Sequence, residues 1–197
     1  MTAALSQAED VPVSTHVAAR AASILPPFRA MKTILLFAAT AALVSCARAV
    51  RVTTSAPSAA MVSASGEPIG TLAVQATSSG VRIRGNLRNL SPGAHGIHVH
   101  AVGACTTPDF QSAGAHLNPA SRQHGLENPS GSHAGDLPNI TADAAGNATV
   151  DLTSTNLALS EITDADGSAI VVHAAADDQR TDPSGNSGAR VACGVVR

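Results

Sequence analysis

Six of the eight histidines lie between His95 and Asp136, a stretch that also contains one cysteine and two aspartates. His98 and His100 stand two residues apart in the segment His95-Gly96-Ile97-His98-Val99-His100. Side chains alternate between the two faces of a β-strand, so a strand here would direct Ile97 and Val99 to the core and both histidines to the opposite face. The sequence therefore predicts two imidazoles side by side on a rigid element.

Further histidines and an aspartate follow in a segment rich in glycine, proline, serine and asparagine. They are His116, His124, His133 and Asp136, and His173 comes later in the chain. The composition predicts a long loop, which is unusual in a compact domain unless function or a metal fixes it. Imidazoles with one carboxylate suit Zn(II), and imidazoles alone also suit copper. Any one of these histidines is more often a surface or capping residue, but the spacing of the whole set favours a metal centre.

Six stretches of the chain resemble the copper/zinc superoxide dismutases. They are Gly96-Ile97-His98-Val99-His100, Gly114 to Pro119, His124-Gly125, His133-Ala134-Gly135-Asp136-Leu137, Val171-Val172-His173 and Gly185-Asn186-Ser187-Gly188-Ala189-Arg190-Val191-Ala192-Cys193-Gly194-Val195. The resemblance covers about residues 60 to 197. It is specific because residue type and spacing agree at every ligand position of the family.

The resemblance implies one copper and one zinc ion per subunit. The implied copper set is His98, His100, His116 and His173, and the implied zinc set is His116, His124, His133 and Asp136. His116 would bridge the two metals as an imidazolate, an ionisation that two adjacent cations make feasible. The implied reaction converts two superoxide anions to O2 and H2O2 by Cu(II)/Cu(I) cycling, with His116 passing a proton to the product and zinc holding the loop.

The resemblance also assigns roles outside the two ligand sets. Arg190 corresponds to the family's guanidinium beside the copper channel, where a permanent cation docks a small anion. Asp177 corresponds to a carboxylate that links a copper histidine to a zinc histidine through their outer nitrogens. His95 corresponds to a histidine that bonds the backbone and binds no metal. The segment 178–188 lacks the paired Glu and Lys that steer superoxide in eukaryotic relatives, and Arg180 and Arg122 are candidates to replace them in part.

The three cysteines are Cys46, Cys105 and Cys193. The resemblance implies a disulfide between Cys105 and Cys193 that would clamp the loop to the last strand. Cys105 stands farther from His116 than the corresponding cysteine of the eukaryotic enzymes. Export to an oxidising compartment would let such a bond persist, and it could contribute about 4 kcal/mol in the chain-entropy model.

Short alternating runs surround the histidine segment and predict an all-β fold. Leu72, Val74 and Ala76 alternate with polar or small residues, as do Val81 and Ile83, and Thr77 to Gly80 predicts a hairpin turn between the two runs. Further strands are predicted at residues 147–153, 169–174 and 190–196, with a weak edge strand near residues 60–64. No convincing amphipathic helix is present, so an antiparallel sandwich or barrel is expected. The resemblance makes this an immunoglobulin-like, eight-stranded Greek-key barrel with a long metal-binding loop.

The N-terminal region predicts export. Met31-Lys32-Thr33 opens an apolar run from Ile34 to Val44 that is too short to span a bilayer, so residues 31–45 are a predicted signal peptide. Residues 1–30 are then a misassigned upstream extension, and the alternative is an unusually long n-region. Leu43-Val44-Ser45-Cys46 resembles a lipoprotein processing box, which would lipidate Cys46. The competing Ala47-Arg48-Ala49 exit would release a soluble protein. Residues 46–60 then form a flexible tether and residues 61–197 the folded domain.

The formal net charge of −2 and the lack of a basic run argue against nucleic-acid binding. The favoured function is an exported superoxide dismutase of the bacterial cell envelope, either lipid-anchored or soluble in the periplasm, which protects the envelope from superoxide. A non-catalytic copper/zinc-binding protein for buffering or delivery is the alternative. Bacterial relatives are monomers or dimerise through different surfaces, and the sequence does not decide whether this chain forms a homodimer.

Overall fold

The computed structural model describes residues 56–197, so the predicted extension, signal peptide, Cys46 and most of the tether lie outside the described residues. The strands are β1 (Ser58–Ser63), β2 (Pro68–Thr77), β3 (Gly80–Leu87), β4 (Gly93–His95), β5 (Ile97–His100), β6 (Ile140–Ala142), β7 (Ala148–Ser154), β8 (Ala169–His173) and β9 (Arg190–Val195). Two single helical turns complete the elements, the 3-10 turn η1 (Gln111–Ala113) and α1 (Leu159–Ile162). The all-β prediction is confirmed.

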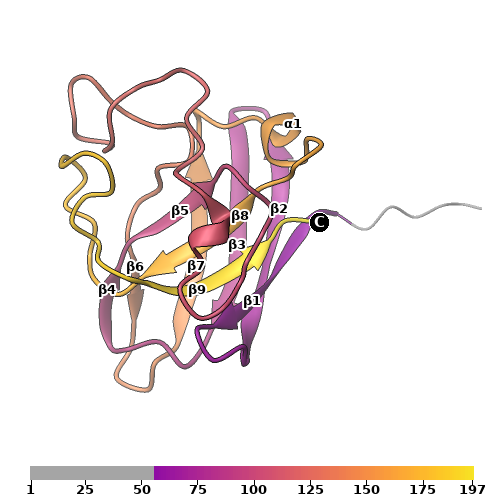
Figure 1. Cartoon of the computed structure of the whole chain (residues 1–197), viewed down its shortest axis with the longest axis vertical. Helices are drawn as coiled ribbons and strands as arrows, with labels where there is room; N and C mark the ends of the chain where they lie inside the picture. The colour runs from indigo at the N-terminus through magenta and orange to yellow at the C-terminus, as the bar shows by residue number, and fades with distance from the viewer. Residues whose placement is uncertain (1–55) are drawn as a thin grey trace, which may run out of the picture. The chain divides into compact units, whose positions relative to one another are not determined.

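The strands form one large curled sheet and one small sheet, antiparallel throughout (Figure 1). The seven-stranded sheet has the order β5-β8-β9-β1-β2-β3-β7, and β4 pairs with β6 in the second sheet. Neighbours in sequence pair in β1-β2-β3 and in β8-β9, whereas β5 with β8 and β3 with β7 are joined over long connections, as in a Greek key. The curled sheet is a half-barrel that carries the site on its β5-β8-β9 side.

The structure has one strand more than the eight that were predicted because the chain changes sheets at Gly96. Residues 93–95 pair with β6, whereas residues 97–100 pair with β8. Between them, the Gly96 N–H donates to the Ala175 carbonyl (2.8 Å) and its own carbonyl accepts from the His173 N–H (2.8 Å). This corner sets β5 alongside β8 as its antiparallel neighbour, which brings His98 close to His173.

The first strand is not the edge strand that its weak pattern predicted. β1 lies inside the sheet, with β2 on one side and β9 on the other. Its alternate residues Ala59 and Met61 are buried in the core, with 0% and 1% of their surface exposed. Small side chains hid this burial from a hydrophobicity pattern, since alanine and serine give little contrast between the two faces.

The core is aliphatic and follows the predicted alternation. Leu72, Val74, Val81 and Ile83 are fully buried between the curled walls of the sheet. Burial of each such side chain contributes about 1.5–3 kcal/mol. On the outer face, Arg82 forms a bidentate ion pair with the Asp151 carboxylate (2.7 and 2.6 Å), an exposed contact that adds little to stability. The barrel is therefore held mainly by its aliphatic interior, to which the first metal loop adds Ala134 and Leu137.

Two long loops leave the β5-β8-β9 side, at residues 101–139 and 174–189, and they approach each other at the same end of the domain (Figure 1). The Arg180 guanidinium in the second loop pairs with the Glu127 carboxylate in the first (2.6 Å). Within residues 56–197, no helix has the length and apolar character needed to cross a membrane. The loops carry most of the residues that the sequence assigned to chemistry.

Candidate metal centre

Strand β5 divides its side chains as predicted. Ile97 and Val99 belong to the main core, whereas His98 and His100 lie on the opposite face, where both are fully buried beneath the long loops. Strand β8 pairs with β5 and ends at His173, so the His98 and His173 ring centroids lie 4.8 Å apart. Three imidazoles are thus placed by paired strands whose other face is anchored in the core.

Each of these three rings is held at one nitrogen and free at the other. The held nitrogens are His98 Nε2, which donates to Asp177 Oδ2 (2.7 Å), His100 Nδ1, which donates to the Gly114 carbonyl (2.9 Å), and His173 Nδ1, which donates to the Gly188 carbonyl (3.1 Å). The opposite nitrogens, His98 Nδ1, His100 Nε2 and His173 Nε2, are buried without a hydrogen-bond partner. Unpaired buried polar atoms are costly, so three of them in one place indicate a ligand.

The free nitrogens converge with His116. His98, His100, His116 and His173 each offer a ligating atom within 4.8 Å of the others. Burial lowers the pKa of His100 to about 2 and that of His173 to about 3, so both rings are neutral near pH 7. Neutral imidazoles present lone pairs without first losing a proton, and four of them fit copper.

The loop reaches this group by packing its backbone directly on β5. Val99 donates its N–H to the Gly135 carbonyl (2.9 Å) and accepts from the Leu117 N–H (2.8 Å). A side chain at position 135 would collide with the Val99 carbonyl. Isolated bridges pair His100 with His116 and His98 with Asp136, which brings the loop ligands beside the strand ligands.

A second cluster surrounds one oxygen of Asp136. Its Oδ1 lies 3.0 Å from His116 Nδ1, 3.0 Å from His124 Nδ1 and 3.2 Å from His133 Nδ1. Backbone N–H groups of Gly125 (2.8 Å) and His133 (2.9 Å) hold the other oxygen, Oδ2. A tetrahedral zinc site with bonds of about 2.0–2.1 Å has edges of about 3.3 Å, close to these separations.

His98, His116, His124 and Asp136 also offer ligating atoms that lie within 4.8 Å of one another. His98 enters because its ring stacks on His116, with centroids 4.0 Å apart. His133 nevertheless points its Nδ1 at the same centre, 3.4 Å from His116 Nδ1. His133 is the fourth zinc ligand that the resemblance predicts, and His98 is the one that it assigns to copper.

The zinc-side cluster is electrostatically unlike the copper-side one. Burial opposes a charge on His124, but its contacts with Asp136 and Asp177 outweigh burial and raise the pKa of His124 to about 9. The same histidine contacts outweigh burial at both carboxyl groups and hold the pKa values of Asp136 and Asp177 well below the usual range. For His116, burial is the larger influence and lowers the pKa to about 4.

Asp177 lies between the two clusters. Its Oδ2 accepts from His98 Nε2 (2.7 Å) and its Oδ1 accepts from His124 Nε2 (3.0 Å). The Asn139 side chain grips the Asp177 backbone from both sides, donating to its carbonyl and accepting from its N–H, each at 2.8 Å. A side chain at Gly185, where φ is +60°, would collide with this carboxylate. One carboxylate therefore orients one ring in each cluster.

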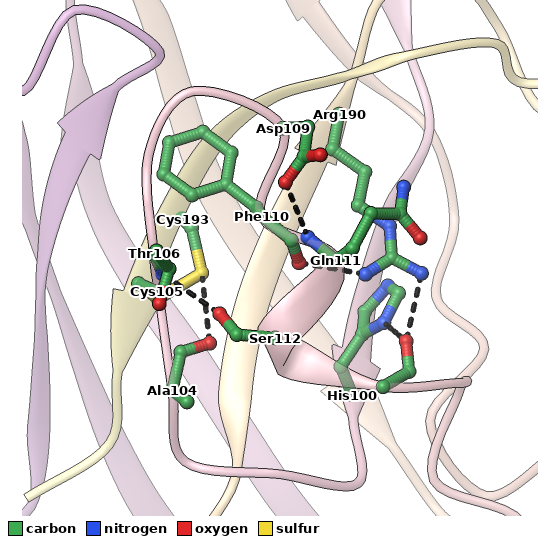
Figure 2. Close-up of a disulfide and its surroundings, with 11 residues drawn as sticks. His100, Ala104, Cys105, Thr106, Asp109, Phe110, Gln111, Ser112, Arg190 and Cys193 are labelled. Atoms are coloured by element: carbon green, nitrogen blue, oxygen red, sulfur yellow. Dashed lines mark hydrogen bonds between the residues drawn. A yellow bond between two sulfur atoms is a disulfide. The ribbon is translucent and has the colours of Figure 1, made fainter.

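Arg190 stands at the mouth of the centre. It lines an open pocket of about 320 Å³ together with His116, His173 and Gln111. Partial burial lowers the pKa of Arg190, an effect that the Asp109 carboxylate opposes, and a guanidinium stays charged in proteins. A disulfide joins Cys105 to Cys193, which ties the loop to β9 three residues after Arg190 (Figure 2).

The structure also shows the contacts of residues around the two clusters, some of them predicted and some not. His95 bonds the backbone, as expected, through the His173 carbonyl (2.7 Å) and the Ser91 carbonyl (2.7 Å). Arg180 is engaged with Glu127, which offsets its charge for steering. Sequence reasoning missed Asn139, and it missed Asp182, whose Oδ1 accepts from the His124 N–H (2.7 Å) and lies 3.8 Å from His133 Nε2.

Comparison with known proteins gives one consistent result. A family model described as copper/zinc superoxide dismutase matches residues 69–196. A Cu-Zn superoxide dismutase of Caulobacter vibrioides is 47% identical over 139 residues, covering 67% of this chain and 80% of that protein. Cu-Zn superoxide dismutase 1 of Aquifex aeolicus is 43% identical over 143 residues, covering 70% and 85%.

Solved structures agree with these relatives. The crystal structure of a SOD-like protein from Bacillus subtilis matches with a TM-score of 0.66 and 38% identity, covering 70% of this chain and 96% of that one. The Cu/Zn superoxide dismutase from Brucella abortus matches with a TM-score of 0.61 and 31% identity, covering 71% and 98%. The chain belongs to the copper/zinc superoxide dismutase family, whose members are oxidoreductases that use copper and zinc.

Proposed function

We propose that this enzyme disproportionates superoxide at a centre in which His98, His100, His116 and His173 hold copper and His116, His124, His133 and Asp136 hold zinc. This proposal rests on three buried ring nitrogens that have no hydrogen-bond partner, those of His98, His100 and His173. They converge beside the pocket that the Arg190 guanidinium lines. Copper supplies one-electron exchange with superoxide, while zinc has no redox chemistry. Two superoxide anions and two protons then give one O2 and one H2O2.

The chain's own residues bind the anion and supply a proton. The Arg190 guanidinium faces the pocket and attracts a small anion, while the surrounding loops restrict access to larger molecules. His116 turns Nδ1 toward Asp136, so Nε2 on the other side of the ring is the atom that can carry a proton to the departing peroxide. Asp177 keeps the His98 and His124 rings oriented while this happens.

A non-catalytic copper- or zinc-delivery role is not favoured. Metal buffering requires ligands but gives no use for a guanidinium fixed at the pocket mouth beside His116 and His173. All four copper positions and all four zinc positions of the family are also present in this chain. The complete set of residues suits turnover.

Metal loading with activity measurement tests the centre. We expect the purified protein to take up one copper and one zinc per chain and to consume superoxide. His173→Ala should lose copper and activity but keep zinc, whereas His116→Ala should disturb both ions. Fewer than two ions per wild-type chain, or full activity in His173→Ala, would contradict the proposal.

We further propose that the enzyme works in the bacterial cell envelope, anchored through a lipid on Cys46, where it removes superoxide formed outside the cytoplasm. The Leu43-Val44-Ser45-Cys46 box supports this, as do the disulfide and the bacterial relatives. Labelling cells with a radioactive fatty acid tests the anchor. Label in the wild type and none in Cys46→Ala is expected, and an unlabelled wild type that stays soluble would favour release after Ala47-Arg48-Ala49 instead.

A further inference from the structure

Two backbone carbonyls of one loop hold the guanidinium of Arg190. Its Nη1 donates to the Phe110 carbonyl (2.7 Å; Figure 2). Its Nη2 donates to the Gly114 carbonyl (2.7 Å). No acidic side chain forms an ion pair with Arg190 among the described residues. The backbone of residues 110–114 therefore sets where the positive charge lies in the pocket.

The Phe110 carbonyl is displayed by an uncommon backbone conformation. Phe110 has φ 55° and ψ 23°, in the left-handed region that residues other than glycine seldom adopt. Its N–H donates to the Thr106 carbonyl (3.0 Å), and its carbonyl also accepts from the Ala113 N–H (3.1 Å). Such a conformation persists where the surroundings hold the residue in place.

The phenyl ring provides that hold. Phe110 is fully buried in a small apolar cluster, separate from the main core, with Ala113, Ala169, Val171 and Cys193. In Figure 2 the ring lies toward Cys193 while the carbonyl points to Arg190. Strands β8 and β9 supply the far wall of the cluster, so the ring anchors the loop to the same strand that carries Arg190.

The loop is thus fastened twice, by the Cys105–Cys193 disulfide and by the Phe110 ring. The disulfide lies five positions before Phe110, whereas the ring belongs to the very residue whose carbonyl binds the guanidinium. The next residue, Gln111, lines the pocket itself. Movement of the ring out of its cluster would therefore displace the carbonyl and the pocket wall together.

We propose that Phe110 is a positioning residue for superoxide docking, whose buried ring fixes the carbonyl that holds Arg190 at the pocket. This inference rests on the anion-docking role of Arg190 proposed above. The Gly114 carbonyl strengthens the link, because it accepts from both Arg190 Nη2 (2.7 Å) and His100 Nδ1 (2.9 Å). The loop thereby sets the guanidinium in register with a copper-side histidine.

Azide titration of the copper- and zinc-loaded protein tests the inference, with the visible absorption of copper as the readout. A second readout is whether each variant changes KM or kcat for superoxide. Phe110→Ala should weaken azide affinity about tenfold, the loss expected for one hydrogen bond to a charged group. Phe110→Leu, which still fills the cluster, should retain most of the affinity. The double variant Phe110→Ala/Arg190→Ala should bind azide no more weakly than Arg190→Ala alone, because both act through one guanidinium.

Ile83→Ala is the matched control, since it removes a fully buried side chain from the main core, away from the loop. It should lower thermal stability while leaving azide affinity unchanged. If Phe110→Ala fails to fold, Phe110→Val removes the ring more gently and should still weaken azide binding. Unchanged affinity in the folded Phe110 variants, alongside a weakened Arg190→Ala, would overturn the role of Phe110. Unchanged affinity in Arg190→Ala would overturn the docking role of Arg190 instead.

Discussion

The proposed copper side of the centre stands on strands, whereas the proposed zinc side is made by a loop. His98, His100 and His173 project from β5 and β8, whose other faces are fixed in an aliphatic core. His124, His133 and Asp136 belong to the segment 101–139, whose only helix or strand is the short 3-10 turn η1. The first cluster is positioned by folding of the barrel, while the second depends on how the loop packs against β5 and on its contact with Asp177.

Protonation divides the two sides in the same way. The copper-side rings His100 and His173 are neutral because burial excludes their charge, whereas His124 is held as a cation between Asp136 and Asp177. A preformed, neutral cluster is ready to accept a metal. The zinc-side cluster, with its protonated His124, reaches its metal-bound arrangement only when zinc displaces that proton. The loop side is therefore expected to respond more strongly to metal, to pH and to loss of a single contact.

The largest effect is expected from Asp136→Asn. This change removes the single anion of the zinc set. Zinc binding at a structural site contributes about 10–16 kcal/mol through all of its ligands together, so several kcal/mol of zinc-binding free energy should be lost. Chelator competition should show weak zinc binding, and hydrogen exchange should show residues 114–139 opening while β2 and β3 stay protected. Asp151→Asn, at an exposed carboxylate on the barrel, is the control. Equal exchange in loop and barrel would contradict the division.

Loss of the disulfide should rank second. Replacing Cys105 and Cys193 by serine releases a crosslink between residues 88 positions apart, which costs on the order of 4 kcal/mol in the chain-entropy model. The melting temperature of the metal-loaded protein should fall accordingly. Because Phe110 still fastens the loop, azide affinity should fall less than in Phe110→Ala. A larger loss of azide affinity than in Phe110→Ala would show that the disulfide alone positions Arg190.

Asp177→Asn probes the connection between the two sides. The two carboxylate oxygens of Asp177 accept from His98 Nε2 and His124 Nε2, one each. An amide has a single oxygen, so one of the two rings loses its acceptor and its orientation. Loss of such an outer partner typically lowers metal affinity about 10- to 100-fold. Zinc should be affected more than copper, since His98 remains fixed by its strand. Competition titrations with each metal separately would measure the ratio, and a greater loss of copper would reverse the comparison.

Zinc binding to the metal-free protein should release protons. His124 has a pKa of about 9, so it carries a proton at pH 7 that zinc must displace. Zinc affinity should rise about tenfold for each pH unit up to about pH 9 and level off above it, as expected for one displaced proton. Calorimetry in buffers of different ionisation enthalpy would count the proton. Zinc affinity that is independent of pH between 7 and 9 would contradict the charge on His124.

Much of the fold could be predicted because its signal is local. Alternation in residues 71–85 predicted buried β2 and β3, and the Ile97-His98-Val99-His100 pattern predicted which side chains face the core. The prediction failed where local signals are weak. Alanine and serine in β1 gave no sign of an internal strand, and nothing in the sequence revealed that the chain changes sheets at Gly96.

The sequence by itself determined the chemistry of the centre: which residue types are present, at what spacing, and which known family they match. The tertiary structure alone decided how those side chains are held. The Phe110 carbonyl meets Arg190 across 80 residues, and Asn139 meets Asp177 across 38. Neither contact has a local pattern, since a backbone carbonyl belongs to every residue and its direction depends on the packing of distant segments.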